Sequence, residues 1–180
     1  MGAGAVGGFF GARLAQMGAT VTLIGRAGHV EAIRERGLAL TSGGALTHVR
    51  MAASTDISAL AGADVVLVTV KSTDTDAVAA SLADVLPTDA LIVSLQNGVD
   101  NEEIIASGLG QKRLIPGTLT SAISRRGIGS IQLERLRGMG VASGHPLSER
   151  LASALSEAGL NARLYPNAVD MKWSKMLTNL

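Results

Sequence analysis

Residues 1–26 read MGAGAVGGFFGARLAQMGATVTLIGR, and this stretch decides the fold. Its opening fits G-x-G-x-x-G, the pattern at the first turn of a dinucleotide-binding unit, through Gly2, Ala3, Gly4, Ala5, Val6 and Gly7. There the first glycine permits a tight turn, the second lets a pyrophosphate approach the backbone, and the third lets helix and strand pack closely. The phosphates lie at the helix N-terminus, where free N–H groups favour an anion. In a chain with 22 glycines the pattern is weak alone, and flexible packing is the alternative.

Strands and helices are predicted in alternation around this motif. Apolar periodicity predicts helices at 8–17, 27–36, 76–86, 101–107, 147–158 and 168–180, and strands at 20–24, 63–70, 90–95, 113–119 and 161–165. Two alternating stretches in 38–53, separated by Ser42-Gly43-Gly44, predict a hairpin or a short excursion, and 122–142 contains further β-like pieces. The apolar run ADVVLVTV at 63–70 is typical of a central strand buried on both faces. The sequence therefore predicts an α/β fold with a Rossmann-like, doubly wound, mainly parallel sheet.

The strand that should precede the glycine motif is missing from the sequence. In the doubly wound order this strand lies in the middle of the sheet, so its neighbours would lack a partner and the sheet would be split. The missing strand would bury about four Val or Ile side chains, each of which stabilises the fold by roughly 1.5–3 kcal/mol. Losing this burial would forfeit a free energy comparable to the whole stability of a typical domain, about 5–15 kcal/mol. We therefore expect a further N-terminal segment in the natural protein.

The composition argues against several classes of function. The net charge is +1 and charged residues are scattered singly, so no basic stripe indicates nucleic-acid binding. The sequence has no cysteine and no histidine spacing that suits a metal. No run of about 18 apolar residues predicts a membrane span, and Arg13 interrupts the apolar N-terminus, which argues against a signal peptide. We expect a cytoplasmic protein in which His29, His48 and His145 are surface residues.

Arg26 follows the strand at 20–24, roughly 20 residues after the glycines. An NAD-preferring fold places Asp or Glu at this point to hold the ribose 2′-hydroxyl. A guanidinium can instead grip a 2′-phosphate in a fork, whereas a carboxylate would repel it. The residue therefore favours NADP, and an ordinary surface arginine is the alternative.

Two polar positions follow buried strands further along the chain. Lys71 ends the strand at 63–70, and Asn97 follows the strand at 90–95. Ligands of open α/β sheets bind at the carboxyl ends of the strands, which makes both residues candidates for the nicotinamide or substrate site. Asn97-Gly98 is also a common turn sequence, so only its position after a buried strand favours a functional interpretation.

The last predicted helix has two distinct faces. Its apolar residues recur at i, i+3, i+4 and i+7 and must pack on something: Trp173, Met176, Leu177 and Leu180. Lys175 and Asn179, four residues apart, share a different face. From periodicity alone, a polar pair of this kind is more often solvated surface than a functional site.

Together these motifs resemble the ketopantoate reductase (2-dehydropantoate 2-reductase) family over nearly the entire chain. The resemblance is carried by GAGAVG at 2–7, VTVKSTDT at 68–75, LQNGVDNEE at 95–103, PGTLT at 116–120 and KWSKMLTN at 172–179. The last segment is the most specific, because the family has a similar Trp-x-Lys-x-x-x-Asn at the start of its helical second domain. The resemblance implies NADPH-dependent reduction of 2-dehydropantoate to pantoate, a step toward pantothenate and coenzyme A.

The resemblance also implies roles for individual residues. Lys175 matches the catalytic lysine, which would hydrogen-bond the ketone oxygen of the 2-keto acid and supply a proton. Asn179 matches a substrate-binding asparagine, Asn97 a residue that contacts cofactor and substrate, and Lys71 a residue near the nicotinamide. Ile123 falls where the backbone of the family touches the cofactor. Because an ordinary lysine has a pKa of about 10.4, the site should depress the pKa of Lys175.

The resemblance divides the chain into an NADP-binding Rossmann-like domain at 1–166, without its first strand, and the start of a helical substrate domain at 167–180. Most of that second domain is absent from the sequence, so we expect the chain as given to be inactive and its last apolar helix face to be exposed. The full-length protein is compatible with a homodimer. The alternatives are a related dehydrogenase of 2-keto or 3-hydroxy acids, a non-catalytic NADP-binding module, and a non-functional fragment.

Overall fold

The computed structural model describes residues 1–177 of the chain. Its helices are α1 (Ala5–Gln16), α2 (Ala27–Arg36), α3 (Thr75–Val85), α4 (Asn101–Leu109), α5 (Ser148–Glu157) and α6 (Ala168–Leu177). Its strands are β1 (Thr22–Ile24), β2 (Leu38–Ser42), β3 (Ala45–Val49), β4 (Ala52–Ser54), β5 (Val65–Val68), β6 (Leu91–Ser94), β7 (Leu114–Leu119), β8 (Ala122–Gly127), β9 (Ser130–Arg135), β10 (Met139–Ala142) and β11 (Ala162–Tyr165). The predicted order of elements is therefore confirmed, with ends that differ by a few residues.

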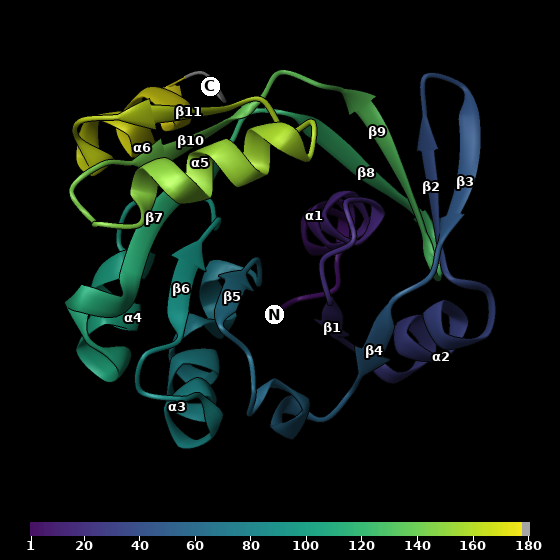
Figure 1. Cartoon of the computed structure of the whole chain (residues 1–180), viewed down its shortest axis with the longest axis horizontal. Helices are drawn as coiled ribbons and strands as arrows, with labels where there is room; N and C mark the ends of the chain where they lie inside the picture. Colours follow the sequence, from purple (N-terminus) through teal and green to yellow (C-terminus); the bar gives the residue numbers. More distant parts are fainter. Residues whose placement is uncertain (178–180) are drawn as a thin grey trace.

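The main sheet has the strand order β11-β10-β7-β6-β5 (Figure 1). Strands β5, β6 and β7 run parallel, as the alternation of strands and helices predicts, whereas β10 pairs antiparallel with β7 and parallel with β11. A short connection can join antiparallel neighbours, and β10 reaches β7 through the excursion at 120–138 without a crossover helix. The sheet is thus mixed where the sequence predicted a mainly parallel one.

The main sheet is separate from the parallel pair β1-β4. Residues Met1–Ala3 bridge the gap: the Met1 amino group donates to Leu67 O at 2.7 Å, and Gly2 N donates to Ile24 O at 3.1 Å. The predicted split of the sheet is confirmed. The expected complete burial of the strand at 63–70 is wrong, because β5 lies at the edge of its sheet and Val65 is 46% exposed.

Apolar side chains cover both faces of the main sheet. All four residues of β6 are buried, and its three apolar residues alternate between two hydrophobic clusters. Leu91 and Val93 belong to the cluster that contains Phe10, and Ile92 belongs to the cluster that contains Leu82. Helices α1 and α5 therefore cover one face and α3 and α4 the other. This is the two-sided burial expected for a doubly wound sheet.

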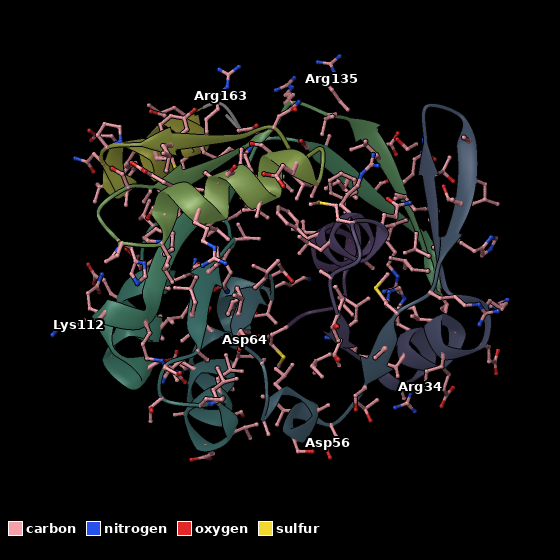
Figure 2. The ribbon with its side chains drawn as sticks, in the orientation of Figure 1. Arg34, Asp56, Asp64, Lys112, Arg135 and Arg163 are labelled. Carbon is pink, nitrogen blue, oxygen red and sulfur yellow. The ribbon has the colours of Figure 1, made fainter. Side chains whose placement is uncertain are left out.

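A second mixed sheet, β3-β2-β9-β8, packs against α1, which lies between it and the main sheet (Figure 1). The hairpin at Ser42-Gly43-Gly44 is confirmed, since β2 and β3 pair antiparallel around it. The sequence did not predict that β2 also pairs parallel with β9, about ninety residues later in the chain. Charged side chains such as Arg135 and Arg163 project outward from the fold (Figure 2).

One expectation about the histidines is wrong. His29 is buried, and its Nδ1 accepts a hydrogen bond of 2.9 Å from Gly129 N. The loop between β8 and β9 covers α2 at this point, and this contact joins residues 100 positions apart. His48 is exposed, as predicted, whereas His145 is only partly exposed. No helix within residues 1–177 is long and apolar enough to cross a lipid bilayer.

Candidate functional site

The glycine turn has the geometry that a pyrophosphate site requires. Gly2 has φ +96°, a left-handed conformation that glycine adopts without strain. Gly4 is the N-cap of α1, and within the described residues no atom lies within 4 Å of where its Cβ would be. A Cβ on Gly7 would instead collide with Gly2 O and lie 2.6 Å from Thr69 Oγ1. Gly2 therefore allows the turn, Gly4 leaves space for a ligand to approach the backbone, and Gly7 allows close contact between the helix and the turn.

The first turn of α1 is suited to an anion. It holds no acidic side chain, and no side chain caps its N-terminus. Free N–H groups and the helix dipole therefore face the open side of Gly4, where a dinucleotide phosphate fits. The residues present thus match the cofactor that the motif predicts.

Arg26 lies beside this turn. It is the exposed N-cap residue of α2, directly after β1 and Gly25. Gly25 packs on the turn so closely that a Cβ there would lie 2.7 Å from the Cβ of Ala3. The exposed Arg26 side chain therefore starts close to the glycines, within reach of the place where a 2′-phosphate would lie.

A cavity of about 420 Å³ gathers four of the predicted residues: Val6, Asn97, Ile123 and Lys175. They come from α1, the turn after β6, β8 and α6, so distant segments of the chain converge here. Apolar Leu95 and Leu119 and the hydroxyl groups of Ser121 and Ser124 complete much of the wall. The lining is thus about half apolar and half polar, with the Glu134 carboxylate among the polar groups, and convergent polar groups are typical of a small-molecule site.

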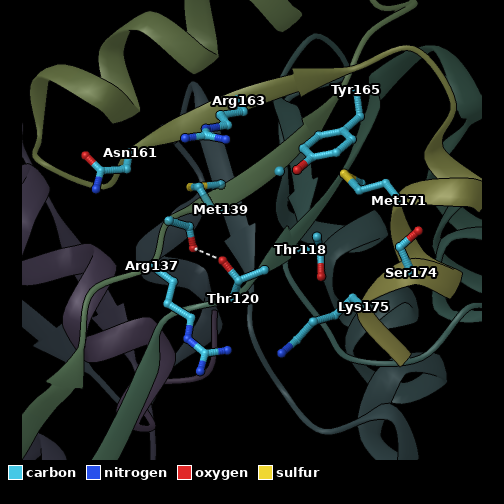
Figure 3. Close-up of a pocket in the computed structure, with 12 residues that line it drawn as sticks. Thr118, Thr120, Arg137, Met139, Asn161, Arg163, Tyr165, Met171, Ser174 and Lys175 are labelled. Carbon is cyan, nitrogen blue, oxygen red and sulfur yellow. Dashed lines mark hydrogen bonds between the residues drawn. The ribbon is translucent and has the colours of Figure 1, made fainter. Parts of the chain in front are cut away.

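Lys175 also lines a second cavity of about 280 Å³, together with Thr118, Thr120, Arg137 and Arg163. Figure 3 shows Arg137 and Lys175 extending toward the same space from the β9–β10 loop and from α6. Burial lowers the pKa of Lys175, and the nearby positive charge of Arg137 lowers it further. The predicted depression of this pKa is therefore present, and it makes the ammonium a better proton donor near neutral pH.

Hydrogen bonds fix the backbone of Asn97. Its carbonyl oxygen accepts from Ser72 Oγ at 3.0 Å and from Asn101 Nδ2 at 2.7 Å. The preceding residue, Gln96, is buried, and its Nε2 donates to Val70 O and to Thr75 Oγ1. The ends of β5 and β6 are thus connected, and the Asn97 amide extends from a rigid support.

The other predicted residues are placed less centrally. Lys71 is an exposed residue that precedes the 3-10 turn Ser72–Asp74, three residues after β5 ends, and it lines neither cavity. Asn179 lies outside the described residues. The exposure predicted for the last helix is present at Trp173 and Leu177, which are 48% and 67% exposed.

Sequence reasoning missed two features of the site. Arg137 follows β9 in a loop whose sequence carries no recognisable signal, although it faces Lys175. Lys172 is buried and forms an ion pair of 2.7 Å with Glu102. Its spacing of three residues from Lys175 was the available clue, because residues at i and i+3 share a helix face. Within residues 1–177, no cluster of His, Asp or Glu side chains suits a metal ion.

Comparisons with known proteins agree with this arrangement. The family model for ketopantoate reductase PanE/ApbA matches residues 1–143. The chain is 35% identical to a 2-dehydropantoate 2-reductase of Pyrococcus horikoshii and 31% identical to one of Halobacterium salinarum, and covers 59% and 61% of their lengths with 99% of its own. It therefore spans about three fifths of the length of these relatives.

Solved structures show the same similarity. A PanE/ApbA family ketopantoate reductase from Ralstonia eutropha superposes with a TM-score of 0.93 at 36% identity, over 99% of this chain and 59% of that one. A D-mandelate dehydrogenase solved with NADH and anilino(oxo)acetate superposes with a TM-score of 0.87 at 26% identity, over 99% and 59% of the two chains.

Proposed function

The chain belongs to the ketopantoate reductase PanE/ApbA family, and from this premise we propose that the whole protein is an NADPH-dependent 2-dehydropantoate 2-reductase. Its substrate is a small 2-keto acid, and its product is pantoate, the corresponding 2-hydroxy acid. In this proposal residues 1–166 bind the cofactor, and α6 begins the part that binds substrate.

One observation carries the proposal: Asn97 and Lys175 line the same cavity as Val6, which lies in the first turn of α1. A phosphate at the N-terminus of α1 would place the rest of a dinucleotide along the carboxyl ends of the strands. The cavity then receives both the nicotinamide and a carbonyl compound. A proton donor and an amide are within reach of this space, as ketone reduction requires.

Lys175 serves as the general acid. When bound, the reduced nicotinamide supplies a hydride to the carbonyl carbon. The ammonium of Lys175 hydrogen-bonds the carbonyl oxygen, stabilises the negative charge that develops there, and transfers one proton to it. Because burial and Arg137 both lower the pKa of Lys175, this transfer is easier than from an ordinary lysine. The Asn97 amide orients the substrate, and Leu95 and Leu119 form the apolar part of the wall beside it.

Arg26 sets the preference for NADPH. Its exposed position beside the glycine turn suits a 2′-phosphate, which NADH lacks. By the family resemblance, Lys71, three residues after β5, and the backbone of Ile123 would help to hold the nicotinamide end of the cofactor. Asn179 belongs to the proposed substrate site through the motif that it shares with Lys175.

A related dehydrogenase of another 2-keto acid is the second candidate. The D-mandelate dehydrogenase that superposes with a TM-score of 0.87 favours it, because one fold here accommodates a bulkier 2-hydroxy acid. Binding of NADPH without turnover would instead indicate a non-catalytic module.

The test is a substrate panel on the whole protein. We expect loss of NADPH absorbance with 2-dehydropantoate, and slower loss with phenylglyoxylate, the 2-keto acid that corresponds to mandelate. A higher kcat/KM with phenylglyoxylate would assign the protein to the second candidate. Tight NADPH binding with no turnover of any 2-keto acid would overturn the proposed reductase activity.

A further inference from the structure

Lys172 is buried on the inner side of α6, where a lysine is unusual. Its side chain is 4% exposed and that of Glu102 is 13% exposed, with Lys172 Nζ 2.7 Å from Glu102 Oε1. The same Nζ donates a hydrogen bond of 2.8 Å to Gln96 O. Burial lowers the pKa of Lys172, and the Glu102 carboxylate opposes this by favouring the ammonium. A single side chain on α6 thus contacts α4 and the end of β6.

The contact joins the two halves of the candidate site. Lys172 lies three residues before Lys175, about 4.5 Å along the helix axis and on a neighbouring part of its surface. Gln96 directly precedes Asn97. Lys172 Nζ therefore holds the peptide group of Gln96, which lies next to Asn97. Because Lys172 and Lys175 lie on the same turn of α6, the same contact also helps to fix the position of Lys175.

The Gln96 end of this connection is itself rigid. Gln96 Nε2 donates to Thr75 Oγ1 at 2.8 Å, and Thr75 Oγ1 donates to Asn101 Oδ1 at 3.0 Å. Asn101 then donates to Asn97 O at 2.7 Å. Lys172 consequently attaches α6 to a closed set of buried hydrogen bonds that already fixes Asn97.

A purely structural role is the competing interpretation. A buried ion pair contributes little to stability on balance, because removing two charges from water costs about as much as their attraction returns. Apolar side chains of similar size would hold α6 equally well. Unlike an apolar side chain, the ammonium also fixes the geometry of the contact, because it holds a carbonyl oxygen and a carboxylate at hydrogen-bonding distance.

We propose that Lys172 is a positioning residue, which sets the distance between Lys175 and Asn97 by tying α6 to Gln96 and Glu102. This inference rests on the proposed reductase function. Lys172 is not among the residues that line the two cavities, so it would act through Lys175 and Asn97 and not on the reacting atoms.

The experiment removes both charges together. Lys172→Met alone would leave the Glu102 carboxylate buried without a partner and could unfold the chain. The double variant Lys172→Met with Glu102→Gln avoids this, and Lys112→Met, at an exposed lysine, is the matched control. Thermal melts and NADPH titrations establish that each variant folds and binds cofactor.

We expect the double variant in the whole protein to bind NADPH within about twofold of wild type and to lose roughly 100-fold in kcat, as a displacement of about 1 Å can cause. In the chain alone, NMR signals of the Lys175 side chain and the Asn97 amide should shift and broaden. A folded double variant with unchanged kcat and unchanged signals would overturn the proposal. If wild type reduces no 2-keto acid, the reductase function fails, and the NMR comparison still decides whether Lys172 positions Lys175.

Discussion

Gly7 faces the carbonyl oxygen of Gly2 so closely that no methyl group fits between them. The contact closes the turn at 2–7 and brings the start of α1 against Thr69 at the end of β5. Gly4, in the same turn, has open space at the corresponding position within the described part of the chain. Gly7 therefore contributes to the fold, whereas Gly4 contributes to the ligand site.

Alanine substitutions at Gly7 and Gly4 should separate the effect on stability from the effect on cofactor binding. Gly7→Ala forces a Cβ into backbone and should lower the free energy of unfolding by about 3 kcal/mol or more, within the range known for overpacking and strain. Gly4→Ala meets no atom of the described chain, so its melt should stay near wild type while NADPH binding is lost. Urea denaturation and fluorescence titration with NADPH measure both effects. Equal stability of the two variants would contradict this division.

Arg26→Ala should change cofactor preference without changing the fold. Loss of the guanidinium removes a charge-assisted hydrogen bond to the 2′-phosphate, so the Kd for NADPH should rise about tenfold or more. The Kd for NADH should change little, because NADH has no phosphate there. Arg36→Ala, at an exposed arginine in the last turn of α2, is the control. A similar loss for both cofactors would rule out a phosphate-binding role for Arg26.

The fold was predictable where one segment alone carries the pattern. The apolar run that contains β6 and the helix at Ala27–Arg36 follow from local periodicity, and both are found. The exposure of β5 does not follow from its own apolar run, because it depends on which backbone lies beside it; the missing first strand was the signal for an open edge. The pairing of β2 with β9 depends in the same way on contacts between distant segments, which periodicity does not encode.

The residues of the site likewise divide into those that local motifs identify and those that depend on contacts between distant segments. Asn97 and Lys175 were identified from motifs, and the structure brings them to one cavity. Arg137 has no local signature, and the spacing of Lys172 from Lys175 does not reveal its ion pair with Glu102, because both roles depend on a residue of another element. His29 was assigned to the surface for the same reason, since the loop that buries it lies a hundred residues away.

Replacing the proposed general acid should affect turnover and leave cofactor binding almost intact. Lys175→Ala removes proton transfer and charge stabilisation at the ketone oxygen, so kcat in the whole protein should fall about 10²–10⁴-fold. NADPH affinity should remain within about twofold, because the glycine turn and Arg26 are unchanged. Stopped-flow measurement of NADPH oxidation and a separate NADPH titration test the two expectations. A Kd that rises as much as kcat falls would point to a cofactor-binding role for Lys175.

His29 should make the chain less stable in mild acid. Burial and, to a lesser extent, Arg125 lower the pKa of His29, so the folded state prefers the neutral ring that accepts from Gly129 N. The unfolded state binds a proton below about pH 6.5, so the free energy of unfolding should fall as the pH drops below this value, by up to about 1.4 kcal/mol per pH unit. His29→Gln should flatten this dependence in urea titrations, and His48→Gln, at an exposed position, should not. A steeper slope in His29→Gln would show that the sign is wrong.

Arg137 should set the alkaline limit of the reaction through Lys175. Its positive charge helps to lower the pKa of Lys175, so Arg137→Met should raise that pKa. Because the acid must carry its proton, the rate falls as the pH rises through this pKa, and the alkaline limb should move to higher pH. NMR titration of the lysine side chain gives the same shift directly in the chain alone. Arg163→Met is the matched control, since Arg163 lines the same cavity but is not among the causes that lower the Lys175 pKa. If both variants leave the titration of Lys175 unchanged, burial alone accounts for its lowered pKa, and Arg137 must have another role in that cavity.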